Sequence, residues 1–400
     1  MLTNRQIFLS YLAQTSESPM MLEIASAKGV FMYGPSGEKY IDLISGVSVS
    51  NTGHCHPCVV DAVKKQAETY FHLMVYGEMI QSPQVRYAEQ LARILPDSLS
   101  SCYFVNSGSE AVEGAMKLAK RFTGRSRIIS FKNSYHGSTH GALSIQGSER
   151  FKNAFRPLLP DTLQIVFDEK ALGAIDDKTA CVVIETVQGE AGVIDPGKAF
   201  LTELRNRCSK HGALLVMDEI QTGFGRTGLM FAFERAGVIP DILLLAKSLG
   251  GGMPLGAFIS SREIMSSLAK DPVLGHITTF GGHPVCCAAG LAALEVIIKE
   301  NLIGNCKLRS AQVKKLLQHH LIKEIRGEGL LLAVQLSHPE YVAYCVKHAP
   351  EYGIILDYFL FCEDAFRISP PLVINEDEMR TGCKMVLKLL DDASVKVNLK

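Results

Sequence analysis

The chain has no excess of either charge sign and no long apolar run. Its 41 lysines and arginines equal its 41 aspartates and glutamates, so the formal net charge is zero. This balance argues against the basic stripe of a nucleic-acid-binding protein and the acidic composition of a disordered tail. No stretch approaches the roughly 20 consecutive apolar residues that a membrane-spanning helix requires. We therefore expect neither a nucleic acid nor a membrane as a partner.

The first residues also lack the basic start and apolar stretch of a secretory signal. The 11 cysteines are odd in number and scattered, with one adjacent pair at Cys286 and Cys287. This pattern is typical of reduced core cysteines and predicts a cytoplasmic protein. The length of 400 residues, 47% of them hydrophobic, suits two or three structural units with a large core.

The middle of the chain alternates short apolar runs with amphipathic stretches, which predicts an α/β fold with a mostly parallel sheet. Because the apolar runs are rich in Val, Ile and Leu throughout, both faces of the sheet should be covered. Helical spacing marks residues 111–122 and 200–208. The expected strands are residues 102–105, 127–131, 163–167, 181–185, 213–218, 241–246 and 256–260.

The two ends of the chain have a different pattern. Residues 20 to about 60 form short alternating segments and turns, and beyond about 310 a helical stretch (313–321) leads to a strand-like stretch (329–336), a strand and a helix. We predict a large central domain, residues 61–305, and a smaller α+β domain built from residues 1–60 and 306–400. Clefts between such domains are favoured ligand sites.

Three strand ends carry residues that could share one site. The run 241–246 ends in Lys247, Asp218 ends another strand, and the segment 106–110 lies between a strand and a helix. A buried charge needs a partner or a chemical use, and a desolvated lysine becomes nucleophilic, as Schiff-base formation requires. Because ligands of open α/β sheets bind at the carboxyl ends of strands, these groups should lie together.

Each of these features also has a simpler interpretation. Lys247 could extend its charge to solvent, and Asp218 could cap the following turn instead of pairing with a protonated ring nitrogen of a cofactor. Ser107 and Glu110 match a capping box, while Gly108 and the free amides of a helix N-terminus suit a phosphate. From the residues alone, a plain helix cap and a phosphate site both remain open.

Further candidates follow other predicted strands. Tyr135 could stack on a planar cofactor, Gln221 could hydrogen-bond an oxygen, and Arg367 could bind a substrate carboxylate. Glu185 and Glu190 flank a Gln-Gly pair. Taken one at a time, these residues also fit a core aromatic, solvated loop residues and a surface ion pair.

Two other patterns are not interpreted as sites. Residues 223–228 match G-x-G-x-x-G, but four residues separate them from the strand and no helix begins within them, so they predict an ordered loop. Cys55 and Cys58, with His54, are reminiscent of a metal site, but no second ligand cluster of suitable spacing is present. We expect turn residues there and no metal.

Together the motifs resemble those of class III aminotransferases, pyridoxal-phosphate enzymes that include the ornithine, acetylornithine and 4-aminobutyrate aminotransferases. The resemblance rests on residues 216–228 and 240–252. Six further matches follow in order along most of the chain, at residues 53–57, 106–110, 135–137, 187–190 and 279–282 and at Arg367. The resemblance implies fold type I of these enzymes and a homodimer with shared active sites.

The resemblance also implies roles toward pyridoxal phosphate. Lys247 would hold the cofactor as a Schiff base and transfer a proton, Asp218 would pair with the pyridinium nitrogen, and Gln221 would reach the phenolic oxygen. The other cofactor-binding residues would be Gly108, Ser109, Tyr135 and, from the other subunit, Thr279.

For the substrates, the resemblance implies a ping-pong transfer from a terminal amine to 2-oxoglutarate. The donor would be an ω-amino acid, an ornithine-like compound or a diamine. In ω-aminotransferases of this family, the residues matching Glu190 and Arg367 pair in one half-reaction, and the glutamate then moves aside so that the arginine binds a dicarboxylate. Ser138 stands where ornithine-type relatives usually carry an arginine for the α-carboxylate, which weakens ornithine as the donor.

Other reactions remain open, because a fold does not determine a reaction. An aminomutase, a racemase or a dialkylglycine-type decarboxylase would share this scaffold and its cofactor. A transaminase consumes a second substrate stoichiometrically, whereas a mutase or a racemase needs none. A nicotinamide-dependent oxidoreductase would be colourless and would not need Lys247.

Overall fold

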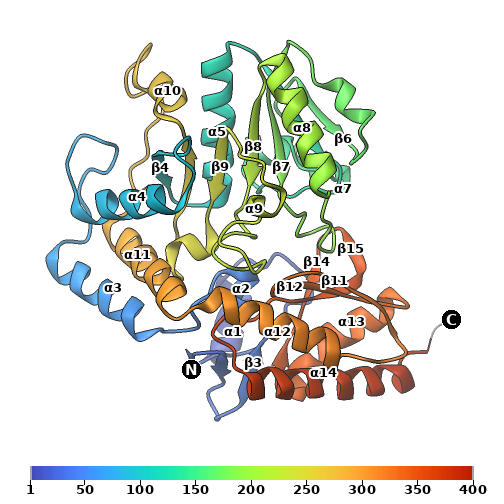
Figure 1. The fold of residues 1–400 in the computed structure, drawn as a ribbon. Helices are drawn as coiled ribbons and strands as arrows, with labels where there is room; N and C mark the ends of the chain where they lie inside the picture. Colours follow the sequence, from blue (N-terminus) through green and yellow to red (C-terminus); the bar gives the residue numbers. More distant parts are fainter. Residues whose placement is uncertain (1, 399–400) are drawn as a thin grey trace.

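A seven-stranded sheet forms the centre of the molecule, with strand order β4-β10-β9-β8-β7-β5-β6 (Figure 1). All strands are parallel except β10, which is antiparallel to both of its neighbours. The predicted mostly parallel sheet is confirmed, and each predicted strand is present with its ends moved by at most two residues. The strands are β4 (Ser101–Val105), β5 (Arg127–Phe131), β6 (Thr162–Ile165), β7 (Thr179–Glu185), β8 (Leu214–Asp218), β9 (Ile242–Leu245) and β10 (Gly256–Ser260).

Alternate residues of the central strands pack into two separate cores, one on each face of the sheet. In β7, Val182 and Ile184 belong to one core, and Cys181 and Val183 belong to the other. Helix α5 (Gly108–Thr123) covers one face and α8 (Lys198–His211) covers the other (Figure 1). This two-sided burial is the physical reason for the continuous apolar runs, and both predicted helices are confirmed.

The remaining helices of this part flank the sheet. Helix α11 packs against both α3 and α4, and α4 lies beside β4, the edge strand of the sheet (Figure 1). Their bounds, with those of the short helices, are α3 (Pro57–Thr69), α4 (Ser82–Ile94), α6 (His140–Ser144), α7 (Glu149–Lys152), α9 (Phe233–Ala236), α10 (Arg262–Met265) and α11 (Pro284–Lys299).

Two four-stranded sheets, built from both ends of the chain, occupy the lower half of Figure 1. One has the order β1-β2-β3-β13, in which β3 pairs in parallel with β13, and the other has the order β11-β12-β15-β14. The strands are β1 (Ser26–Lys28), β2 (Phe31–Tyr33), β3 (Lys39–Asp42), β11 (Ile322–Glu328), β12 (Leu331–Leu336), β13 (Ile354–Ile355), β14 (Asp357–Phe359) and β15 (Cys362–Ile368). The helices are α1 (Asn4–Tyr11), α2 (Ser45–Ser48), α12 (Leu302–Leu316), α13 (Pro339–His348) and α14 (Glu376–Lys396).

Two sequence predictions in this region need correction. The helix expected at 313–321 is wrong beyond residue 316, because α12 ends there and turns lead into β11. The strand expected at 329–336 starts only at Leu331, because Gly329 has a left-handed backbone (φ +56°) within the β11–β12 turn. Helices α3 and α12 cross the expected domain boundaries after residues 60 and 305, so the division into domains stays a prediction.

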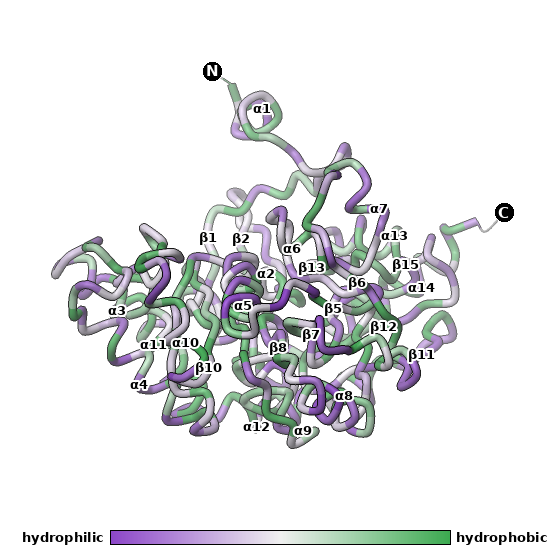
Figure 2. The backbone as a smooth tube through the Cα atoms, turned by 90° about the horizontal axis from the view of Figure 1, so that it is seen from above, coloured by the Kyte–Doolittle hydropathy of each residue, from purple (hydrophilic) through white to green (hydrophobic). Residues whose placement is uncertain are grey.

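The computed structural model describes residues 2–398. Met1, Leu399 and Lys400, which belong to the expected terminal domain pieces, lie outside the described residues. Across residues 2–398, none of the helices combines the length and the apolar character needed to cross a membrane. Helix α1 lies on an arm that projects from the body, and none of its residues is buried (Figure 2).

Candidate active site

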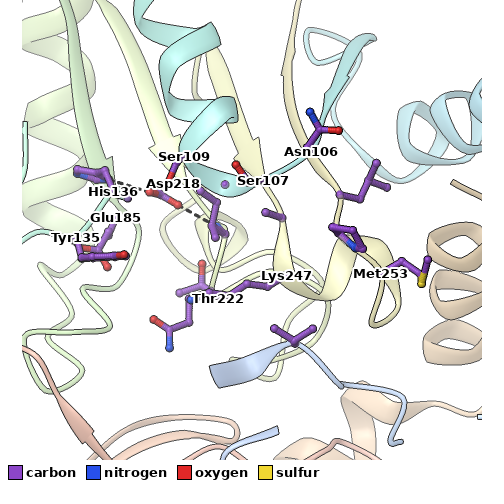
Figure 3. A pocket seen from close by; sticks show the side chains of 18 of the residues that line it. Asn106, Ser107, Ser109, Tyr135, His136, Glu185, Asp218, Thr222, Lys247 and Met253 are labelled. Carbon is purple, nitrogen blue, oxygen red and sulfur yellow. Dashed lines mark hydrogen bonds and ion pairs between the residues drawn. The ribbon is translucent and has the colours of Figure 1, made fainter. Parts of the chain in front are cut away.

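A cavity of about 500 Å³ lies at the carboxyl ends of the parallel strands (Figure 3). It is lined from the central sheet and from Val49 of the N-terminal segment. The structure brings six of the seven residues expected to bind the cofactor into its wall. These are Gly108, Ser109, Tyr135, Asp218, Gln221 and Lys247.

Lys247 follows β9 on a firmly held loop. Its backbone is left-handed (φ +50°), which is unusual for a residue other than glycine and needs support from its surroundings. Such support comes from Ser248, whose Oγ donates to the carbonyl of Ser48 (3.0 Å), and from Tyr87, whose hydroxyl donates to the carbonyl of Leu249 (2.6 Å). The lysine side chain therefore reaches the cavity from a rigid backbone.

The cavity alters the acid–base behaviour of Lys247. Loss of hydration lowers the pKa of its ammonium group to about 8, against a partial opposing effect of the Glu190 carboxylate, and the nearby charge of Arg367 lowers the pKa further. An amine with such a pKa is partly neutral near pH 7. Lys247 is thus prepared to act as a nucleophile or as a base.

Asp218, at the end of β8, is held by two contacts. Its Oδ2 lies 2.8 Å from Nδ1 of His136, and its Oδ1 accepts from the amide of Ile220 (3.0 Å). Both side chains are buried, and Figure 3 shows the pair on one side of the cavity. The sequence assigned no role to His136. It follows β5, which is separated from β8 by β7, and this strand order cannot be read from the sequence.

Glu185, at the end of β7, organises two neighbouring loops. Its carboxylate accepts from the amides of Tyr135 (2.8 Å) and Gly189 (2.9 Å). Burial raises the pKa of Glu185 to about 7. The contacts place Tyr135 and the loop that carries Glu190 at adjacent strand ends.

The N-terminus of α5 faces the cavity. Oγ of Ser107 accepts from the amide of Glu110 (3.2 Å), but the Glu110 carboxylate accepts from Asn106 (2.8 Å) and not from the N-cap residue. Only half of the predicted capping box is therefore formed, because the Glu110 side chain binds the amide of Asn106, the residue before the N-cap Ser107. The first amides of a helix have no partner within it and suit an anion such as phosphate. A Cβ at Gly108 would lie 3.0 Å from a side-chain methyl of Ile220, so a larger residue would require Ile220 to shift.

Gln221 has an unused donor at the cavity. Its Nε2 is buried and has no hydrogen-bond partner among residues 2–398. The loop that carries it is held by Glu219, which accepts from the amides of Ala232 (3.0 Å) and Phe233 (2.7 Å). The cavity thus presents four groups: the free amide donor of Gln221, the N-terminus of α5, the carboxylate of Asp218 and the amine of Lys247. This set fits the pyridoxal phosphate that the sequence resemblance implies.

Glu190 and Arg367 form an ion pair beside the cavity, although neither lines it. Oε1 of Glu190 lies 2.6 Å from Nη2 of Arg367, and the two side chains are 9% and 1% exposed. Among the described residues, Nε and Nη1 of Arg367 have no partner. The arginine therefore keeps donors that could bind a carboxylate if the glutamate moved away.

Thr279 and Ser138 are both exposed, and neither lines the cavity. Thr279 is exposed and outside the cavity, whereas its neighbour Thr278 accepts a hydrogen bond from Nδ2 of Asn106 (3.2 Å). Ser138 is exposed, and its Oγ lies 3.1 Å from the hydroxyl of Tyr135.

The two patterns not interpreted as sites have structural roles. Residues 223–228 form a loop, as predicted, and its Arg226 is fully buried, donating to the carbonyls of Leu330 (3.0 Å) and Pro370 (2.6 Å). His54 pairs with Asp42 (2.8 Å). No group of three or more possible metal ligands occurs within residues 2–398.

Comparison with known proteins yields consistent matches over nearly the whole chain. The family described as aminotransferase class III matches residues 12–390. The acetylornithine aminotransferase of Methanopyrus kandleri is 41% identical over 362 residues, which cover 89% of this chain and 91% of that protein. The ornithine aminotransferase structure from Toxoplasma gondii ME49 has a TM-score of 0.91 and 30% identity, covering 99% and 97% of the two chains. A PLP-bound amine transaminase structure from an uncultivated Pseudomonas species has a TM-score of 0.87 and 27% identity, covering 96% and 98%.

Proposed function

The chain belongs to the class III aminotransferases, which are pyridoxal-phosphate enzymes, and we propose that it transfers the amino group of a terminal amine to 2-oxoglutarate in a ping-pong sequence. The observation that carries the proposal is the buried pair of Glu190 and Arg367 beside Lys247. With the glutamate in place, the arginine charge is neutralised and an uncharged substrate end is accommodated. With the glutamate displaced, Nε and Nη1 of Arg367 are free to bind the distal carboxylate of a dicarboxylate.

We assign the cofactor to the cavity of Figure 3. When bound, pyridoxal phosphate supplies the electron sink that makes the proton on the reacting carbon removable. Nζ of Lys247 would hold the cofactor and move that proton, Asp218 would supply a negative charge for the ring nitrogen, and Nε2 of Gln221 would donate to the ring oxygen. The amides of Gly108 and Ser109 would bind the phosphate, and the ring of Tyr135 would stack on the cofactor. His136 orients the Asp218 carboxylate.

We also propose a homodimer with shared sites, which the position of Thr279 supports. Since this residue is exposed and outside the cavity of its own chain, we assign its hydroxyl to the phosphate site of the other subunit. The surface nearby in sequence is apolar: Phe280 is 55% exposed and Ile277 is 52% exposed. Such exposed apolar side chains suit a protein–protein contact.

We infer the kind of amino donor from the lack of arginine in the lining of the cavity. Among the described residues, Lys247 is the one lysine or arginine that lines it. An α-carboxylate on the donor would therefore find Ser138 where relatives of the ornithine type have a guanidinium, and a hydroxyl cannot replace that bidentate contact. A diamine or a longer ω-amino acid fits better than ornithine.

A panel of donors tests the proposal. The holoenzyme is mixed with 2-oxoglutarate and one amine at a time, such as putrescine, 4-aminobutyrate, ornithine or acetylornithine, and glutamate formation is measured. We expect the amines without an α-carboxylate to react fastest. Failure of every amine to give glutamate would reject the acceptor assignment, and product formation without any oxoacid would favour a mutase, racemase or decarboxylase.

The matched variant for this panel is Ser138→Arg. A hydrogen bond to a charged group contributes about 1.5–3 kcal/mol, so kcat/KM for ornithine should rise by about tenfold or more. The value for putrescine should not rise, because putrescine has no carboxylate. An equal change for both donors would show that position 138 does not face the α-carboxylate.

The pKa of Lys247 predicts how the cofactor-free protein takes up pyridoxal phosphate. Only the neutral amine attacks a carbonyl, and the folded pKa of about 8 lies below the ordinary value of 10.5. The rate of appearance of the visible absorption band should therefore increase with pH, with its midpoint near pH 8 and a plateau above about pH 9. A rate that keeps rising beyond pH 10 would indicate an ordinary, hydrated lysine.

A further inference from the structure

Glu190 is held by more than its ion pair with Arg367. Its second oxygen, Oε2, accepts from the amide of Leu360 (3.1 Å), and its backbone carbonyl accepts from the amide of Phe361 (3.0 Å). Leu360 and Phe361 are the two residues of the turn between β14 and β15. Both amides of one hairpin turn thus bind the glutamate that covers the arginine.

The same hairpin also surrounds Arg367, which lies on β15. Nη2 of the arginine donates to the carbonyl of Tyr358 (3.3 Å) as well as to Glu190, and its guanidinium carbon lies 4.8 Å from the ring centre of Phe359. The glutamate and the arginine are therefore aligned by a single short element.

The turn has little to stabilise it from within. Two-residue hairpins favour left-handed residues such as Asn-Gly, but neither Leu360 nor Phe361 has a positive φ, and the pairing slips between Tyr358 and Phe359. Phe359 anchors the strand before the turn in a buried cluster, so contacts of the turn itself decide how firmly its tip is held.

One such contact links the turn to helix α7. The ring of Phe361 meets the ring of Phe151 on α7 edge to face, with 5.5 Å between the centres and 78° between the planes. A second link, the ion pair of Arg150 with Glu363, is 79% and 73% exposed and contributes little. The aromatic pair is thus the more effective anchor.

We propose that the Leu360–Phe361 turn is a latch that keeps Glu190 on Arg367, and that the Phe361–Phe151 contact sets how readily the arginine becomes available to a dicarboxylate. The inference rests on the proposed function, in which Arg367 receives the acceptor. A dicarboxylate must compete with the Glu190 carboxylate for Arg367, and the Leu360 amide favours the glutamate in this competition. The apparent affinity of Arg367 for the dicarboxylate is therefore the intrinsic affinity multiplied by the fraction of molecules in which the latch is open. Phe361 is accordingly a positioning residue that acts through Glu190.

The test measures the binding of glutarate, a dicarboxylate without a reactive carbonyl, to the holoenzyme by calorimetry. In Phe361→Ala the turn loses its anchor, and glutarate should bind about threefold to tenfold more tightly than to the wild type. Phe151→Ala removes the same contact from the other side without altering the turn, and it should give the same gain. The KM for 2-oxoglutarate should fall by a similar factor, with kcat nearly unchanged.

Two further variants separate the possible outcomes. Glu363→Gln, on the same hairpin, should leave glutarate affinity within about twofold of the wild type, because its ion pair is exposed. Arg367→Ala should abolish glutarate binding. If it does, and both phenylalanine variants bind glutarate no better than the wild type, the latch is wrong while the acceptor site stands. If Arg367→Ala binds glutarate normally, the acceptor site and the latch are both wrong. General damage to the fold would weaken binding, so the expected gain is specific to the latch.

Discussion

Lys247→Ala is expected to remove the visible absorption band of the holoenzyme and to lower turnover by about 10⁴-fold or more. The substitution removes the amine that holds the cofactor and also the base that moves the proton. The pKa of this amine is lowered to about 8, mainly by burial, so part of it is neutral near pH 7. The measurement is an absorption spectrum of each protein before and after borohydride treatment, together with the rate of glutamate formation.

Lys198→Ala is the matched control, because Lys198 is exposed at the start of α8, outside the lining of the cavity. This variant should keep both the band and the activity. A wild-type protein that stays colourless after addition of pyridoxal phosphate would contradict the assignment of Lys247, as would a Lys247→Ala variant with an unchanged spectrum.

Asp218→Asn is expected to fold and to retain cofactor while losing about 10²–10³-fold in turnover. The asparagine keeps the shape of the side chain but removes the negative charge that we assign to the ring nitrogen. It also alters the 2.8 Å contact with His136, so the orientation of the group is less well defined. Single-turnover rates of each half-reaction, measured by the change in cofactor absorption, give the loss directly.

Asp241→Asn is the corresponding change before β9, at the opposite end of the sheet, where Asp241 pairs with Arg205 (2.7 Å). It should reduce stability slightly and leave turnover per folded molecule unchanged. Near-normal turnover in Asp218→Asn would remove the proposed role of the carboxylate, whatever the control shows.

Much of the fold could be predicted, because an interior strand of a parallel sheet is apolar on both faces. Strands β7, β8 and β9 therefore stand out as apolar runs. The failure at the end of α12 has a related cause. Leu317 and Leu321 are 1% and 5% exposed, so their spacing correctly marked buried residues although the backbone there is not helical. Apolar spacing reports burial more reliably than it reports backbone conformation.

The candidate site was partly predictable for a different reason. Lys247, Asp218 and the α5 N-terminus each follow an apolar strand directly, and the carboxyl ends of parallel strands meet at one edge. His136 gave no such signal, because its partner lies two strands away in the sheet. The turn amides that hold Glu190 could not be foreseen either, since a backbone donor carries no sequence signature.

By itself, the sequence determined the family and the strands that carry the reactive side chains. It could do so because those signals are local: a charged or polar residue at the end of an apolar run, and glycines next to it. The tertiary structure decided which groups meet, such as Glu190 with Arg367 across 177 residues, and both with the turn at Leu360. The physical reason is that a buried charge requires a partner, but the identity of that partner depends on how distant elements pack.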